Sequence, residues 1–263
     1  MTTVADILKY VETLAPTYMK MDWDNVGLLC GCRETSVTKV LVALDPFEGV
    51  CREAVEWGAE LIVTHHPIIF DPLKSVTEET TVGRSIMTLC RHGVSAVNAH
   101  TNLDCAPGGV NDVLAATLGL KDVETIPPFF RDAQGRQWGL LRRGRVEEQP
   151  LSQFLEIVKS SLNAEGLRYV DGGKPVRVVA VGGGHCSDEL MSAFEAGCDT
   201  FVTADIKYND FWDAQALGMN LIDAGHFATE NPVVAVLAEK IAAAFPEVQV
   251  KISETHRDCM KFY

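Results

Sequence analysis

Two adjacent histidines, His65 and His66, end a short apolar run and are followed at once by a proline. A pair of imidazoles held between a strand and a stiff turn suggests a metal site, but two ligands do not complete one. Two further segments offer ligands of the same kind, because each places a histidine four residues before a carboxylate. These segments contain His100 with Asp104 and His226 with Glu230.

The candidate ligands outnumber those of one structural zinc ion, which takes four. They suit two divalent ions, about 3.5–4 Å apart, that share a carboxylate or a water. The donors are nitrogen and oxygen, so zinc, iron, manganese, cobalt and nickel all fit. Bound ions of this kind lower the pKa of water to about 7, which makes hydrolysis the expected reaction class. The expected metal ligands are His65, His66, Asp104, His226 and Glu230.

His100 is the candidate catalytic residue. It shares a turn with Asp104 and its ordinary pKa lies near neutrality, so it could act as a general acid or base. It could equally be an outer partner that orients Asp104. Two aspartates, Asp45 and Asp205, also end predicted strands, and either could orient a ligand histidine.

Short β-branched runs alternate with amphipathic segments in both halves of the chain, which is typical of parallel α/β units. At a constant offset of 139 residues, segment 40–66 aligns without gaps on 179–205, and Gly58 and Thr64 fall on Gly197 and Thr203. Units of this class resemble one another in general, but identities without gaps favour an internal duplication. The sequence therefore predicts two α/β domains of similar topology.

We expect residues 1–124 with 220–263 to form the first domain and residues 125–219 to form the second. Ligands of parallel α/β sheets bind beyond the carboxyl ends of the strands, where all the candidate metal ligands lie. If the two halves face one another, these side chains converge in the cleft between them. At the N-terminus, apolar spacing predicts a helix that begins after Thr3 with a capping box to Asp6.

Composition limits the other functions. The net charge of −13 argues against a nucleic-acid partner, because binding a polyanion needs a basic surface. The eight cysteines are scattered without a CxxC pair, so we expect reduced thiols rather than disulfides or a structural zinc site. No apolar run reaches the ~20 residues that span a bilayer, and the N-terminal segment carries charges that a signal peptide lacks. We therefore expect a cytoplasmic protein that does not contact membranes.

The glycines at 182–184 follow a predicted strand and precede a helix. They could present backbone amides to a phosphate, or they could form a tight turn. Neither GxGxxG nor GxxxxGK[ST] is present, which favours the turn. His185 and Cys186 follow directly, and adjacent residues on a turn rarely face each other, so a nucleophile pair is not expected.

Six sequence blocks together carry a family resemblance. They are WDNVGLL at 23–29, THHPIIF at 64–70, AHTNLD at 99–104, GGVND at 108–112, ADIKYND at 204–210 and DAGHFATE at 223–230. In this order they resemble the NGG-interacting-factor-three-like family, whose bacterial members are commonly labelled GTP cyclohydrolase I type 2 homologues. The resemblance covers nearly the whole chain.

The resemblance implies two intertwined, similar α/β domains with a dinuclear metal site in the cleft between them. It also implies a toroidal homohexamer built as a trimer of dimers, and it assigns the five metal ligands named above. Asp24 and Asn25 would belong to the cleft wall, although they could equally form a turn. The chain departs from the family at Ala204 and Asn209, where a glycine and a histidine are common. Asparagine cannot titrate, so an acid–base role at this position is in doubt.

Three functions stay open from the sequence. The first is a metal-dependent hydrolase acting on a nucleotide or related heterocycle, and GTP ring opening is the version that the family label supplies. The second is a protein that stores or delivers metal ions. The third is an interaction scaffold in which the ring assembly matters rather than the metals. No guanine-reading set of residues is visible, so the sequence does not name the substrate.

Overall fold

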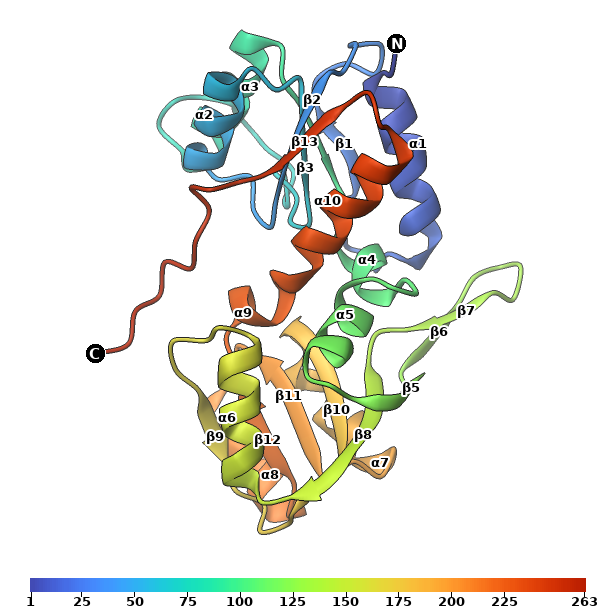
Figure 1. The fold of residues 1–263 in the computed structure, drawn as a ribbon, viewed down its shortest axis with the longest axis vertical. Helices are drawn as coiled ribbons and strands as arrows, with labels where there is room; N and C mark the ends of the chain where they lie inside the picture. The colour runs from blue at the N-terminus through green and yellow to red at the C-terminus, as the bar shows by residue number, and fades with distance from the viewer. The chain divides into compact units, whose positions relative to one another are not determined.

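The computed structural model describes all 263 residues. Its strands form a five-stranded sheet, a six-stranded sheet and a two-stranded ribbon, with helices packed on the sheets (Figure 1). The predicted α/β class is therefore confirmed. The chain divides into two compact units: unit 1 is residues 1–106 with 234–257, and unit 2 is residues 107–233 with 258–263.

These boundaries differ from the ones that the sequence predicts. Residues 107–124 lie in unit 2, where helix α5 (Val110–Thr117) packs against strand β10 (Val176–His185). Residues 220–233 also lie in unit 2, because strand β12 (Asn220–Asp223) pairs with β11 (Thr200–Ala204). The chain then returns to unit 1 through helix α10 (Pro232–Ala244).

The sheet of unit 1 has the strand order β1-β4-β3-β2-β13. Strands β2 (Lys39–Ala43), β3 (Leu61–Thr64), β4 (Ser95–Asn98) and β13 (Gln249–Ile252) run parallel, and β1 (Gly27–Cys30) is antiparallel to β4. Helices on both faces cover such a sheet, which explains why the central strands β2 and β3 are buried and apolar at nearly every position.

The helices of unit 1 are α1 (Val4–Leu14), the 3-10 helix η1 (Thr17–Met19), α2 (Glu48–Trp57), α3 (Thr81–His92), the short α4 (Thr101–Cys105) and α10. Figure 1 shows α2 and α3 on one side of the sheet and α1 and α10 on the other. The predicted capping box of α1 is confirmed, since Thr3 accepts a hydrogen bond from the backbone N–H of Asp6 and the Asp6 side chain bonds back to Thr3.

The sheet of unit 2 has the order β5-β8-β10-β11-β12-β9. Strands β10, β11 and β12 run parallel, while β5 (Lys121–Thr125), β8 (Arg142–Gln149) and β9 (Arg168–Val170) are antiparallel to their neighbours. Strands β6 (Phe129–Arg131) and β7 (Gln137–Gly139) form a separate hairpin.

Two cores lie on opposite faces of this sheet. Alternate residues of the parallel strands, such as Val179 and Val202, pack against α5 and α6 (Leu151–Ser161). The residues between them, such as Ala180 and Phe201, pack against α7 (Leu190–Glu195) and α8 (Tyr208–Leu217). The 3-10 helix η2 (Ser187–Glu189) precedes α7, and the short α9 (His226–Glu230) follows β12.

The parallel pairs β2 with β3 in unit 1 and β10 with β11 in unit 2 have the same register. Val40 pairs with Leu61 in unit 1, and Val179 pairs with Thr200 in unit 2. Both pairs are related by the offset of 139 that aligns the sequences. A duplication would produce this agreement, because strand register fixes which side chains face each core.

The third strands correspond at a different offset. Leu61 pairs with Ser95, and Thr200 pairs with Asn220, so β4 and β12 are related by 125 residues. Helices α4 and α9 then begin at equivalent positions, and His100 corresponds to Gly225 rather than to His226. The two His-x-x-x-carboxylate segments are therefore displaced by one residue relative to the strands that precede them.

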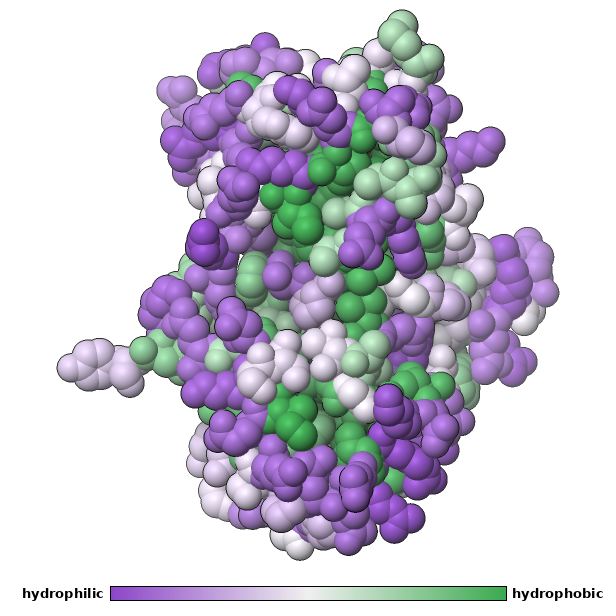
Figure 2. Space-filling model, in the orientation of Figure 1, coloured by the Kyte–Doolittle hydropathy of each residue, from purple (hydrophilic) through white to green (hydrophobic).

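Polar residues cover most of the face seen in Figure 2, and apolar ones gather over α10 in unit 1. None of the helices combines the length and the apolarity needed to cross a membrane. All eight cysteines are free thiols, as predicted.

Candidate metal centre

His65 and His66 follow β3 at its carboxyl end, where the sequence places them. The backbone N–H of His66 donates to the carbonyl of Leu44, and the Thr64 hydroxyl donates to the carbonyl of His66 at 2.7 Å. The first bond continues the pairing of β2 and β3 beyond the ends of the strands, and the second holds the local bend at His66. The imidazoles therefore project from a backbone that the sheet holds rigidly.

His65 is fully buried, and its Nδ1 lies 2.9 Å from the carbonyl oxygen of Ala99. A carbonyl can only accept a hydrogen bond, so Nδ1 carries the proton and the neutral ring has its lone pair on Nε2. Nε2 lies 3.5 Å from Oδ1 of Asp104 on α4. Two electron-pair donors at this distance suit a cation that both coordinate, so His65 and Asp104 fit a metal ion.

His66 is oriented by Asp45, one of the two aspartates that the sequence suggested for this role. Nδ1 of His66 donates to Oδ1 of Asp45 at 2.6 Å. Burial alone would raise the pKa of Asp45, but hydrogen bonds from His256 and His66 outweigh burial and hold this pKa well below its usual range. Asp45 is therefore an ionised acceptor, which leaves Nε2 of His66 as the electron-pair donor.

His100 is held in the same way. It precedes α4 as the N-cap residue, and its Nδ1 donates to Oδ1 of Asp24 at 2.8 Å. Oδ2 of Asp24 accepts the backbone N–H of Thr101 at 3.0 Å. Burial would raise the pKa of Asp24, but the hydrogen bonds from His100 and Thr101 outweigh burial and lower the pKa to about 2. An ionised, buried carboxylate thus fixes a third imidazole.

These three imidazoles form one cluster in unit 1. One ring nitrogen from each of His65, His66 and His100 lies within 4.8 Å of the others. The ring centroids of His65 and His66 are 4.8 Å apart. The ring centroid of His100 lies 5.2 Å from that of His65 and 5.4 Å from that of His66. With Asp104 beside His65, this group of buried and half-buried side chains could hold a metal ion. We call it the unit 1 cluster.

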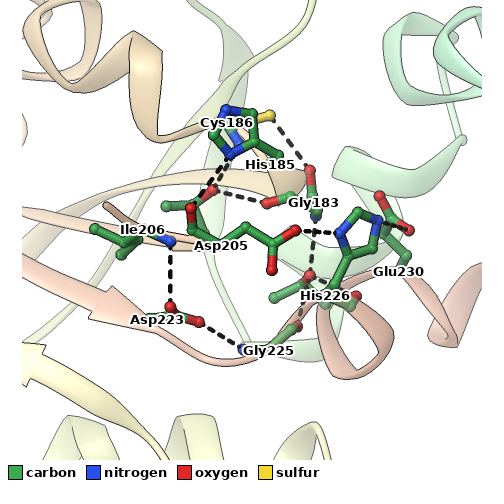
Figure 3. Close-up of polar contacts among 12 residues, drawn as sticks. Gly183, His185, Cys186, Asp205, Ile206, Asp223, Gly225, His226 and Glu230 are labelled. Carbon is green, nitrogen blue, oxygen red and sulfur yellow. Dashed lines mark hydrogen bonds and ion pairs between the residues drawn. The ribbon is translucent and has the colours of Figure 1, made fainter. Parts of the chain in front are cut away.

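The remaining two candidate ligands lie together in unit 2. His226 and Glu230 are one turn apart on α9, and Nε2 of His226 lies 3.0 Å from Oε2 of Glu230. Nδ1 of His226 lies 2.7 Å from Oδ2 of Asp205, so this aspartate orients His226 as Asp45 orients His66 (Figure 3). Asp205 has a positive φ of 52°, a conformation that aspartate tolerates better than most residues.

The glycines at 182–184 make room for this pair. Gly184 has a φ of +61°, and a Cβ there would lie 2.1 Å from Oε1 of Glu230. The amides of Gly183 and Gly184 are already used, because Gly183 donates to the side chain of Asn111 and Gly184 donates to Oγ1 of Thr229. The structure places these glycines within the last part of β10, where its register with β11 shifts. They are shaped around Glu230 and form neither the phosphate-binding loop nor the tight turn after the strand that the sequence left open.

His185 and Cys186 do not face one another, as expected. Cys186 is buried and its thiol donates to the carbonyl of Gly183, whereas Nδ1 of His185 lies 3.3 Å from the carbonyl of Asp205 (Figure 3). Asn209, which departs from the family pattern, is exposed on α8.

Asp24 and Asn25 both serve the unit 1 cluster. The backbone N–H of Asn25 donates to Asp24, and its side chain donates to the carbonyl of Ile69 at 2.7 Å. Asn25 thus ties the turn that holds His100 to the loop that comes after His66. The interpretation of these residues as mere turn formers is incomplete.

Sequence reasoning missed three side chains near the unit 1 cluster. His256 lies 2.8 Å from Oδ2 of Asp45, and no local motif marks it, because it is 211 residues away along the chain. Trp23 and Phe70 are 63% and 52% exposed. Their ring centroids are 5.7 Å apart, and each lies 6.1 Å from that of His100. The sequence blocks that contain these aromatic residues could be recognised, but their proximity in the fold could not be predicted from them.

A cavity of about 320 Å³ opens beside Asp45 and His66 in unit 1. This volume is at the lower end of the range for small-molecule pockets. Its walls are mainly apolar and include Phe47, Ile68 and Val82. A small molecule could therefore lie next to the unit 1 cluster.

The comparisons with known proteins agree with this fold. The family model described as Duf34/NIF3 (NGG1p interacting factor 3) matches residues 2–259. The chain is 35% identical over 262 residues to a Clostridium perfringens protein named "GTP cyclohydrolase 1 type 2 homolog", and the match covers 98% of each chain.

Solved structures show the same likeness. A Bacillus cereus protein related to NIF3 matches with a TM-score of 0.91 at 27% identity, over 100% of this chain and 99% of the other. Staphylococcus aureus protein SA1388 matches with a TM-score of 0.89 at 28% identity, again over 100% and 99%.

Proposed function

Because the chain belongs to the Duf34/NIF3 family, we propose that it is a dinuclear metal-dependent hydrolase acting on a nucleotide or a related heterocycle. The observation that carries the proposal is the unit 1 cluster. Three imidazoles there bind a carboxylate or a carbonyl through Nδ1, which leaves Nε2 as the basic atom of each ring. In His65 and His66 this atom would coordinate a metal ion.

Each unit by itself offers an incomplete set of ligands for two ions. We propose that the two sets act together, with Asp45 and Asp205 orienting the ligand histidines. The donor types admit zinc, iron, manganese, cobalt or nickel. The proposed ligands are those expected from the sequence: His65, His66, Asp104, His226 and Glu230.

His100 is the proposed general acid or base. Divalent ions at such a site supply Lewis acidity and activate water when they are bound. Asp24 fixes Nδ1 of His100, so Nε2 is the atom that takes up or releases a proton on the side of the cluster. The ionised Asp24 also stabilises the protonated imidazole, as a buried carboxylate does in other histidine bases.

The aromatic pair beside His100 supports a planar substrate. Trp23 and Phe70 keep more than half of their surface exposed, although burial of such rings is favourable. A nucleobase or similar heterocycle that stacks on them would lie next to His100 and gain on the order of 1–3 kcal/mol per stacked base. The name of the Clostridium perfringens relative makes GTP the first substrate to test.

The test is release of formate from GTP by the full chain, with metal content measured in the same preparation. We expect Glu230→Ala to abolish turnover, because it removes a buried ligand, while circular dichroism shows that the fold survives. His92→Ala is the control, since His92 lies on α3 and bonds only locally to Thr88. Turnover that persists in Glu230→Ala would contradict the proposal.

Metal storage or delivery is the second candidate function. One observation favours it: position 209 carries an exposed asparagine, which cannot transfer protons, at a place where the family resemblance implies a histidine. Transfer of ions to a metal-free acceptor faster than free exchange would support this function instead. The third function, a hexameric scaffold, has the family resemblance as its support.

A further inference from the structure

We propose that His256, near the end of the chain, is a positioning residue for the metal ligand His66. It acts through Asp45, which bridges the two imidazoles. The inference rests on the proposed metal centre and concerns a residue that neither the sequence motifs nor the ligand set includes.

The bridge uses both oxygens of one carboxylate. Oδ1 of Asp45 accepts Nδ1–H of His66 at 2.6 Å, and Oδ2 lies 2.8 Å from Nε2 of His256. Nε2 of His256 also lies 3.2 Å from the backbone nitrogen of Asp45, which can only donate. The contact with the carboxylate oxygen is shorter, and that oxygen can only accept, so we assign a proton to Nε2 and treat it as the donor to Asp45. With each oxygen bound, the Asp45 carboxylate cannot rotate away from His66. His66 is thereby held in one tautomer and one ring orientation.

The three groups lie in a region with little solvent. The side chains of His256, Asp45 and His66 are 8%, 15% and 18% exposed. Hydrogen bonds to a charged group are stronger in such a setting than in water. The ring of Phe47 also packs edge-on against His256, with centroids 5.9 Å apart. Both effects restrict the movement of His256.

A second buried carboxylate anchors the segment that presents His256. Glu53 of α2 accepts hydrogen bonds from the Ser253 hydroxyl at 2.6 Å, from the Glu254 amide at 3.0 Å, and from the Thr255 amide and hydroxyl. The amide of His256 in turn donates to Oγ of Ser253 at 3.2 Å. This turn is therefore ordered by α2 rather than left as a free chain end.

Strand β13 explains why the segment reaches the site. It runs parallel to β2, and the Ser253 amide donates to the carbonyl of Val42 at 2.8 Å. Asp45 lies just beyond the carboxyl end of β2, so the residues that come after β13 arrive at the same edge of the sheet. His256 could instead serve only to tie down the chain end, and the experiment separates these roles.

The experiment titrates the metal-free full chain with Co²⁺ and records affinity and visible spectrum. His256→Leu keeps the packing volume beneath Phe47 and removes the donor, whereas His256→Gln retains an N–H near the position of Nε2. We expect His256→Leu to weaken Co²⁺ binding about tenfold, the lower end of the effect of outer partners of metal ligands, and to shift the Co²⁺ absorption bands. His256→Gln should restore much of both, and His92→Ala should match the wild type.

Two control results separate the inference from the proposed function. If wild type and His66→Ala bind Co²⁺ equally, the metal centre itself is wrong. If His66→Ala loses Co²⁺ but His256→Leu keeps the wild-type affinity and spectrum, the inference is overturned while the metal centre stands. A His256→Leu variant that melts at a lower temperature with an unchanged spectrum assigns His256 to the chain end alone, and also overturns it.

Discussion

Gly184 shows how a single backbone position shapes the ligand pair of unit 2. Its positive φ already disfavours other residues, and a Cβ would overlap Oε1 of Glu230. We expect Gly184→Ala to displace Glu230 and to weaken divalent-metal binding by at least about tenfold. Equilibrium dialysis with metal analysis measures this loss.

Gly173 provides the matched control for this substitution. It also has a positive φ, +75°, but a Cβ there would meet nothing within 4 Å. Gly173→Ala should cost about 1 kcal/mol of stability from backbone strain and leave metal binding unchanged. Equal metal affinities for the two variants would show that the overlap with Glu230 does not matter.

Among single residues, the sequence revealed those that leave strand ends and concealed those that depend on tertiary pairing. His65, His66 and the orienting Asp45 and Asp205 come after apolar runs, and the structure places them at the ends of parallel strands. His256 carries no such mark, because its position depends on β13 lying beside β2. Local patterns encode where a strand ends but not which distant strand lies next to it.

At the scale of elements, Glu53 links α2 to the turn after β13. Burial would raise its pKa, but hydrogen bonds from Ser253, Glu254 and Thr255 outweigh burial and lower the pKa to about 2, from an ordinary value of 4.5. A carboxyl whose pKa is lowered by folding stabilises the fold at pH values above its pKa in the unfolded chain. This stabilisation is lost as the pH falls from 4.5 towards 2. We expect Glu53→Gln to lower stability by on the order of 2 kcal/mol at pH 7.

Urea unfolding at pH 7 and near pH 3 checks this expectation. The difference between wild type and Glu53→Gln should shrink at the lower pH, because the wild-type carboxylate then begins to lose its advantage. Glu56→Gln, at an exposed position of the same helix, should change little at either pH. If Glu53→Gln lowers stability by the same amount at both pH values, the charge of Glu53 is not what stabilises the turn.

The repeated elements were predictable in part. The gap-free alignment at an offset of 139 matches the register of the first two parallel strands in each unit. The alignment does not extend to α4 and α9. The equal spacing of histidine and carboxylate suggested that His100 corresponds to His226, but the register of the third strands shifts this correspondence by one residue. The periodicity of apolar residues predicts where the strands lie. It does not predict the lengths of the connections that lead to the third strands, and these differ between residues 65–94 and residues 205–219. Such a difference displaces the later elements of one unit relative to those of the other.

At the scale of the whole molecule, the unit boundaries follow pairing rather than sequence halves. The sequence placed residues 220–233 with the first domain, whereas β12 and α9 complete the second unit around β11. As a result, four residues of the proposed centre belong to unit 1 and two to unit 2. These are His65, His66, His100 and Asp104 in the first unit and His226 and Glu230 in the second.

The proposal that both units serve one centre makes a prediction about coupling. His66→Ala removes a donor from unit 1, and Glu230→Ala removes one from unit 2. If the two donors bind the same pair of ions, the second substitution should cost much less after the first, with a coupling of about 1–3 kcal/mol in metal-binding free energy. Calorimetric titration of wild type, both single variants and the double variant measures it. Strictly additive losses would mean two independent metal sites, because residues that share no ligand do not couple in such a cycle.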